Sequence, residues 1–122
     1  MTQMVEKAIT GILRKVKDPE LNINLVDGKL ISKIMVKEDD KSVEIRWIPT
    51  TPFCPLVLVI SAAMILAIRK NLEMGEWKVK VLLDDSVSTA QYWNKQLDND
   101  EIINKIIDNL ESSGQIKYFI TE

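Results

Sequence analysis

The chain has 122 residues and a formal net charge of −2, with 46% apolar and 28% charged residues and an isoelectric point near 5.2. This length and mix suit one globular domain, and the charge excludes a globally positive surface for nucleic acid or an anionic membrane. The absence of histidine excludes Ser-His-Asp and Cys-His catalysis and removes the usual zinc ligand.

The first apolar residues recur at helical spacing and predict a helix from Thr2 to Lys17. We expect Asp18-Pro19-Glu20 to end it, because proline disfavours a helical residue before it and lacks a donor. The opening residues include the acidic Glu6 and have no signal-peptide layout, and the chain has a single cysteine. These features indicate a cytoplasmic protein.

Two strands follow a turn at Asp27-Gly28. Along Leu30–Lys37, Leu30, Ile34 and Val36 are expected to share one face, with Ser32 among them. The stretch Val43–Trp47 alternates apolar and charged residues. The acidic "EDDK" between them predicts a hairpin turn.

The almost wholly apolar run Leu56–Ile68 predicts a helix from Pro55 to Leu72. The run is shorter than the roughly 18 residues of a membrane span, so we expect a buried helix and not a transmembrane one. Since it is apolar nearly all round, its second face needs cover from the terminal helices or from another subunit. The sequence therefore leaves open whether the chain forms a homodimer. A third strand is predicted over Trp77–Leu83.

The stretch "STAQYWNKQL" predicts a short helix or an ordered loop. Asp98 and Glu101 have the spacing of a capping box, so a further helix is expected to begin there and to end at Gly114. The residues after it form a last strand or a packed tail. This order predicts a two-layer α+β domain, a small mixed β-sheet with helices mainly on one face and a right-handed parallel crossover.

The only cysteine lies in "TTPFCPLVLV". Pro55 suits the first position of a helix, which would place Cys54 at the N-cap, where free N–H groups and the helix dipole favour a thiolate. Thr50 and Thr51 offer hydroxyls to the sulfur or to its ligand. A free cysteine beside a core helix is also a common small buried hydrophobe, so a structural role stays open.

Thiol-peroxide chemistry is a third possibility, because "TPFC" has the Thr-x-x-Cys spacing of peroxiredoxins. However, Trp47 stands where their motif has proline, and no arginine follows Arg69. A second, resolving cysteine is also absent.

Three segments together resemble one family: "VKDPELNINLVD" (Val16–Asp27), "LISKIMV" and "TTPFCPL". The family is the SufT/PaaD-like iron–sulfur cluster assembly family. The resemblance implies a non-enzymatic factor that builds or delivers clusters, with the assembly machinery and apo client proteins as partners. It also implies functional roles for Cys54, Thr50, Thr51, Asp18, Glu20, Asn24 and Asp27.

In this interpretation Cys54 is a soft ligand for a transient iron–sulfur cluster or for iron. One thiolate cannot complete a four-cysteine site, so the monomer is not expected to hold a cluster stably. The alternative is a protein–protein adaptor for maturing a metalloprotein such as an oxygenase, with a structural cysteine. The acidic motif residues also have simpler roles, as a helix stop at Asp18 and Glu20 and as a turn cap at Asp27.

The sequence departs from the family pattern at two places. Family members commonly have Asp-Leu-Gly-Leu where this chain has "DGKL" (Asp27–Leu30), so its glycine is displaced. Phe53 replaces a small residue and can shield the thiol. The resemblance also predicts an assembly-like domain over residues 1–97 and a helical extension over 98–122, which covers the apolar helix or docks a partner.

Overall fold

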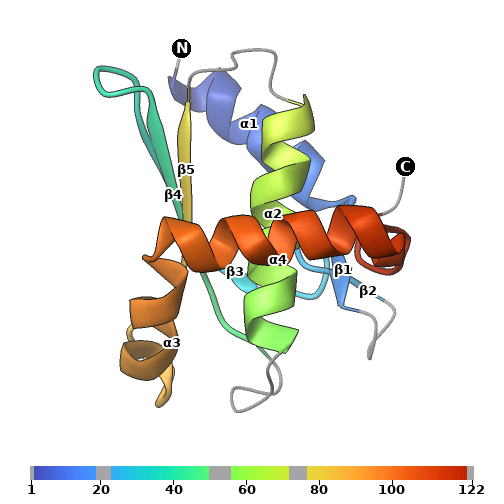
Figure 1. Ribbon diagram of the computed structural model, residues 1–122. Coiled ribbons are helices and arrows are strands. Elements are labelled where there is room, and N and C mark those ends of the chain that lie inside the picture. Colours follow the sequence, from blue (N-terminus) through green and yellow to red (C-terminus); the bar gives the residue numbers. More distant parts are fainter. Residues whose placement is uncertain (1, 19–22, 50–55, 72–76, 121–122) are drawn as a thin grey trace.

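The computed structural model describes residues 2–18, 23–49, 56–71 and 77–120. In this part of the chain, four α-helices accompany a three-stranded sheet and a two-stranded one. Figure 1 shows the larger sheet at the left, with one helix upright beside it and another crossing in front. The predicted α+β class is therefore confirmed.

The larger sheet is mixed. It contains β3 (Ile31–Lys37), β4 (Ser42–Trp47) and β5 (Lys78–Leu83) in the order β3-β4-β5. The β3–β4 hairpin is antiparallel, whereas β4 and β5 are parallel, as the sequence predicts. Alternate residues of β4 are buried, and they form the inner face of the sheet: Val43, Ile45 and Trp47.

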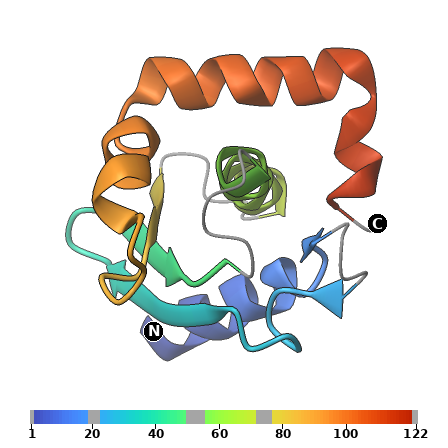
Figure 2. The same ribbon diagram turned by 90° about the horizontal axis from the view of Figure 1, so that it is seen from below.

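The crossover between the parallel strands is α2 (Leu56–Asn71), which packs against the inner face of the sheet. Every residue from Ile60 to Ile68 is buried. Helices α1 (Thr2–Leu13) and α4 (Asp100–Ser113) pack on it from other sides, and Figure 2 shows them on opposite sides of α2 seen end-on. The terminal helices thus supply the cover that an apolar helix requires.

The predicted helix over Thr2–Lys17 is wrong at its end. Helix α1 stops at Leu13, and Lys17–Asp18 instead forms β1, which pairs antiparallel with β2 (Ile23–Asn24). The N–H of Lys17 donates to the Phe119 carbonyl at 2.8 Å. Helix α1 therefore ends before Asp18-Pro19-Glu20 is reached, and the residues expected to be its last turn pair with β2 and with Phe119 instead.

The C-terminal elements largely follow the prediction. The short helix is α3 (Ala90–Leu97), and α4 ends before Gly114, whose φ of +74° is the left-handed conformation that glycine favours. The N-cap of α4 was predicted wrongly, because Asn99 caps it. The Asn99 Oδ1 accepts from the N–H of Glu101 at 3.0 Å, whereas Asp98 pairs with Lys80.

After α4 the chain forms a 3₁₀ helix, η1 (Gln115–Tyr118). Ile120 then makes a single antiparallel bridge with Val16. Of the two predicted outcomes, the packed tail is therefore the one observed.

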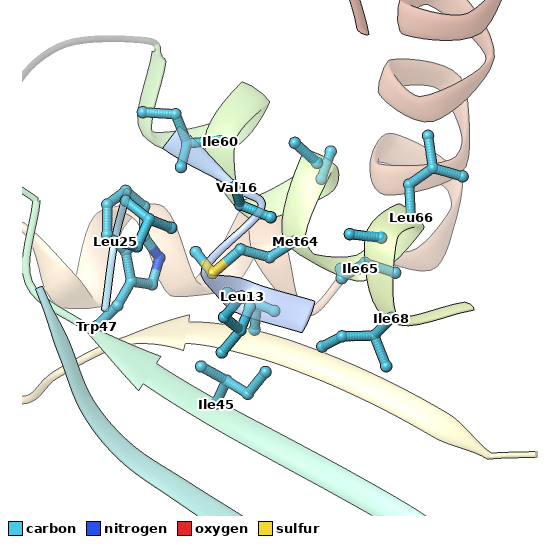
Figure 3. Packing of buried hydrophobic residues seen from close by; sticks show 14 of the residues in the cluster. Leu13, Val16, Leu25, Ile45, Trp47, Ile60, Met64, Ile65, Leu66 and Ile68 are labelled. Atoms are coloured by element: carbon cyan, nitrogen blue, oxygen red, sulfur yellow. The ribbon is translucent and has the colours of Figure 1, made fainter. Parts of the chain in front are cut away.

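One hydrophobic core joins these elements. Figure 3 shows side chains from α1, the β1–β2 region, β4 and α2 in the same cluster, with Met64 of α2 near its middle. Trp47, Met64 and Leu13 are fully buried. The core therefore fixes the end of β4 and the body of α2 relative to each other.

Candidate functional site

The segment that holds the cysteine joins the end of β4 to the start of α2. Cys54, its neighbours Thr50, Thr51 and Phe53, and Glu20 of the amino-terminal motif lie outside the described residues. The described residues on either side show how the two attachment points of the segment are held.

A buried hydrogen bond links these attachment points. The indole Nε1–H of Trp47, the last residue of β4, donates to the Ser61 Oγ in the second turn of α2 at 3.0 Å. Both residues are completely buried. Because an unpaired polar group in the core costs about 1–3 kcal/mol, this bond disfavours separation of the strand end from the helix.

Neighbouring strands also hold the end of β4. The N–H of Ile48 donates to the Leu30 carbonyl at 2.8 Å, and the Trp47 carbonyl accepts from the N–H of Asp84 at 2.9 Å. The chain therefore enters the cysteine segment from a backbone that is bonded on both sides.

A polar cluster that the sequence did not predict lies beside this strand end. Ser32 is the extra residue of a β-bulge, because Ile31 and Lys33 pair with consecutive residues of β4. Its hydroxyl lies 2.7 Å from the Asp84 Oδ2, the acceptor of its one hydrogen. Ser32 is exposed, whereas Leu30, Ile34 and Val36, with which it was expected to share a face, are buried or partly buried.

Asp84 is the centre of this cluster. Its carboxylate accepts from the Ser32 hydroxyl and from the Ser86 N–H, the latter at 2.9 Å. These hydrogen bonds, that of Ser32 first, lower the pKa of Asp84 from 3.8 to about 2. No sequence pattern marks a bulge, although Asp84-Asp85-Ser86 has the composition of a polar turn.

Helix α3 completes the same end of the sheet. The side chain of Asn94 accepts from the Leu83 N–H at 2.8 Å and donates to the Leu83 carbonyl at 3.3 Å. One amide thereby satisfies both outward backbone groups of a residue on the edge strand β5.

The amino-terminal motif forms a separate unit. The Asn24 side chain donates to Asp27 and accepts from the Asp27 N–H, each at 2.8 Å. Arg14 lies 4.0 Å from the same carboxylate. These contacts close the turn before β3, which is the turn role predicted for Asp27.

Lys29 in this turn has a φ of +60°, a left-handed conformation that costs most side chains energy. It stands at the place of the glycine in the family pattern Asp-Leu-Gly-Leu. The displaced glycine of this chain therefore leaves the left-handed position to a lysine.

Asp18 is buried, with 4% of its surface exposed, and it pairs with Ile23 across the β1–β2 ladder. The structure thus brings Asp18, Asn24 and Asp27 into one small unit. In the described ranges, no group of three or more acidic, cysteine or histidine side chains is arranged to hold a metal ion. None of the helices described is long and apolar enough to cross a membrane.

Residues 6–81 match the family model described as iron-sulfur cluster assembly protein. The chain belongs to this family. The SufT/PaaD-like resemblance is thereby confirmed, and the family is one of assembly proteins rather than a known enzyme family. The match ends before α3, and the division into residues 1–97 and 98–122 stays a prediction.

Two relatives extend the likeness. An uncharacterized protein of Methanocaldococcus jannaschii is 32% identical over 84 residues, which cover 69% of this chain and 85% of the relative. A MIP18 family protein of Caenorhabditis elegans is 28% identical over 109 residues, which cover 83% of this chain and 66% of the relative.

Proposed function

We propose that this protein builds or delivers iron–sulfur clusters, with Cys54 as a transient ligand of the cluster or iron that it passes on. Membership of the assembly family supports the general role. The position of the only cysteine supports the ligand: it precedes Leu56, the first described residue of α2, by two positions. Because two residues span at most about 7 Å, this spacing supports a thiol close to the amino end of that helix.

That end of a helix favours an anion, because its free N–H groups and its dipole are positive there. A thiolate is the form of cysteine that binds iron, and such surroundings lower the pKa of a thiol. Thr50 and Thr51 are proposed to donate hydrogen bonds to the sulfur or to its ligand. The Trp47–Ser61 bond supports this role by holding the two attachment points of the segment together.

A single cysteine leaves the cluster, which is cargo here, with open coordination. The remaining ligands would come from the client protein, from a small thiol or from a second subunit. Partners in this proposal are the assembly machinery and apo client proteins. For Asn24 and Asp27 we propose a structural role, which their reciprocal hydrogen bonds support. For residues 98–122 we propose that they complete the core, since α4 packs on α2.

Anaerobic loading with iron and sulfide tests the proposal. Wild type, Cys54→Ala and Cys54→Ser are compared by absorbance and by cluster transfer to an apo-ferredoxin. Of these three proteins, we expect loading and transfer by wild type alone, because both Cys54 variants remove the only thiol. Ser112→Ala, which removes an exposed hydroxyl on α4, is the matched control and should behave as wild type.

Two other results would replace the proposal. If all four proteins stay colourless while Cys54→Ala still binds its partners, the protein is an adaptor and the cysteine is structural. If peroxide converts Cys54 to a sulfenate with saturable turnover, the protein is a thiol peroxidase.

A further inference from the structure

Strand β5 lies at the edge of the larger sheet. Alternate residues of β5 bond to β4, and the residues between them point their backbone groups to the side where no further strand lies. The N–H of Lys78 donates to the Lys41 carbonyl and the N–H of Asp84 donates to the Trp47 carbonyl, both at 2.9 Å. Even-numbered residues of β5 therefore face β4. The N–H and C=O groups of Val79, Val81 and Leu83 point away from the sheet.

The two halves of this edge differ. Asn94 occupies both outward groups of Leu83, and Val81 is completely buried. Val79 and the preceding Trp77 are only partly buried. In the part of the chain that the structure describes, the outward backbone groups of Val79 have no hydrogen-bond partner.

A groove of about 660 Å³ crosses the amino end of the sheet and reaches this open half of the edge. Its walls come from the β3–β4 hairpin, the last turn of α2 and the first turns of α4. They include Met35, Lys37, Arg69, Trp77, Lys78 and Asp100. The groove lies at the amino end of β5, whereas the cysteine segment leaves the carboxyl end of β4. The two features are therefore at opposite ends of the sheet.

The lining of the groove carries a small excess of positive charge, with four cations and three carboxylates. Lys80 pairs with Asp98, and Glu44 pairs with Arg46, a residue outside the lining that also contacts Asp85. The other charged groups of the described lining are three cations and one carboxylate: Lys37, Arg69, Lys78 and Asp100. No ion pair joins any of these four to another described residue. An acidic occupant complements this balance.

The same charges disfavour a second copy of this chain. If two β5 edges paired antiparallel about Val79, Lys78 of each copy would lie opposite Lys80 of the other. Like charges directly opposite each other on paired strands are destabilising, and lysines on an edge strand discourage self-association.

We propose that an extended, acidic segment of a partner protein docks in this groove as an additional strand on β5. Its backbone would bond to the outward N–H and C=O of Val79, and its carboxylates would lie nearest Lys78 on β5, with Arg69 and the more distant Lys37 adding to the positive charge of the groove. Strand addition of this kind takes its affinity from main-chain hydrogen bonds and its specificity from the flanking side chains. The inference goes beyond the proposed function, because it requires no thiol.

The test uses the whole chain and a short acetylated peptide of alternating glutamate and valine as the probe. Titration is followed by the amide signals of the ¹⁵N-labelled protein. We expect the largest shifts at Trp77–Lys80, with the same affinity for Cys54→Ala as for wild type. This last comparison separates the groove from the cluster proposal, since either can fail alone.

Two sets of variants address the two parts of the binding. Val79→Pro removes the outward N–H and leaves the bonds between β4 and β5 in place, so binding should be lost, whereas Val79→Thr should bind as wild type. Lys37→Glu with Lys78→Glu should weaken binding about tenfold or more, because it reverses two charges in the groove. Lys105→Glu, on α4 outside the groove, is the single-charge control.

The charge variants keep the test decisive if Val79→Pro does not fold. Equal affinity of the double lysine variant and wild type would overturn the proposal, as would amide shifts confined to residues outside the groove. A dimer in sedimentation experiments that Val79→Pro dissociates would also overturn it, because the occupant would then be a second copy of the chain.

Discussion

The two ends of the parallel pair β4–β5 are built differently. At the carboxyl end, Asn94 satisfies Leu83, the carbonyl of Trp47 accepts from Asp84, and the Trp47 indole is bonded to Ser61. At the amino end, Val79 faces a groove with its outward groups unpaired among the described residues.

This difference separates two requirements of an assembly protein. A ligand that must hold and release a cluster benefits from a rigid support, because fixed dipoles need no rearrangement when charge arrives. A surface that must accept a partner needs backbone groups that are still available. In this fold the same two strands provide a fixed support at one end and an open edge at the other.

The largest expected effect compares the tryptophans of the two ends. Trp47→Ala should lower the free energy of unfolding by about 3–5 kcal/mol, because it leaves a large cavity in the core. Trp77→Ala should cost less than half as much, since Trp77 is only partly buried. Urea unfolding of both variants measures the difference, and equal losses would contradict the contrast between the ends.

Asn94→Ala should convert part of the closed edge into an open one. It leaves the N–H of Leu83 without its partner, while the Leu83 carbonyl keeps its bond from the Arg46 Nη1–H at 3.2 Å, and the loss should cost about 1–3 kcal/mol. Hydrogen exchange at the Leu83 amide should rise in the variant. Asn104→Ala, an exposed asparagine on α4, should change neither quantity, and unchanged exchange in Asn94→Ala would show that α3 does not protect this edge.

Lys29→Gly should stabilise the fold near the carboxyl end of the β4–β5 pair and so sharpen the contrast between the two ends. The turn at Lys29 leads into Leu30, whose carbonyl holds Ile48 beside the cysteine segment. Because glycine adopts a φ of +60° without steric cost, the variant should gain about 1 kcal/mol of stability. Thermal unfolding measures this gain, and Lys33→Gly, in the β3 strand, should instead be destabilising.

Much of the fold follows from local pattern. Strand alternation predicts β4, the apolar run predicts α2, and together they predict the parallel crossover. The end of α1 does not follow, because Lys17 bonds to Phe119, a contact that no local window contains. The choice of Asn99 over Asp98 as N-cap also depends on a tertiary contact, since Asp98 is engaged by Lys80.

Less of the site is predictable. The sequence indicates Cys54 and its threonines by motif and helix position, and these residues stay predictions. The turn role of Asp27 follows from its place before Gly28, and the structure gives it its partner, Asn24. Ser32 and Asn94 carry no signal, because a bulge and a side chain that imitates a neighbouring strand exist only once the strands have met.

The smallest expected effect is on the pH dependence of the free energy of unfolding. It comes from the Ser32–Asp84 contact near the carboxyl end of the β4–β5 pair. The pKa of Asp84 is about 2 in the folded chain against an ordinary 3.8, so its ionised form stabilises the fold. This contribution is complete above about pH 4 and is lost as the pH falls through about 2. Urea unfolding should show Asp84→Asn less stable than wild type at pH 6, with the difference vanishing toward pH 2.

Asp108→Asn on α4, whose side chain is exposed, is the control and should follow the wild-type curve throughout. A difference between wild type and Asp84→Asn that stays constant from pH 6 to pH 2 would mean that the substitution acts through packing rather than charge.

The bridge between Val16 and Ile120 has a consequence for how the protein is made. These residues are 104 positions apart, from 16 to 120, and Lys17 and Phe119 are bonded beside them. On the ribosome, the signature segment that begins at Val16 leaves the exit tunnel early but lacks this neighbour until residue 120 has emerged. The chain therefore completes its amino-terminal motif only after the rest of the fold has been synthesised.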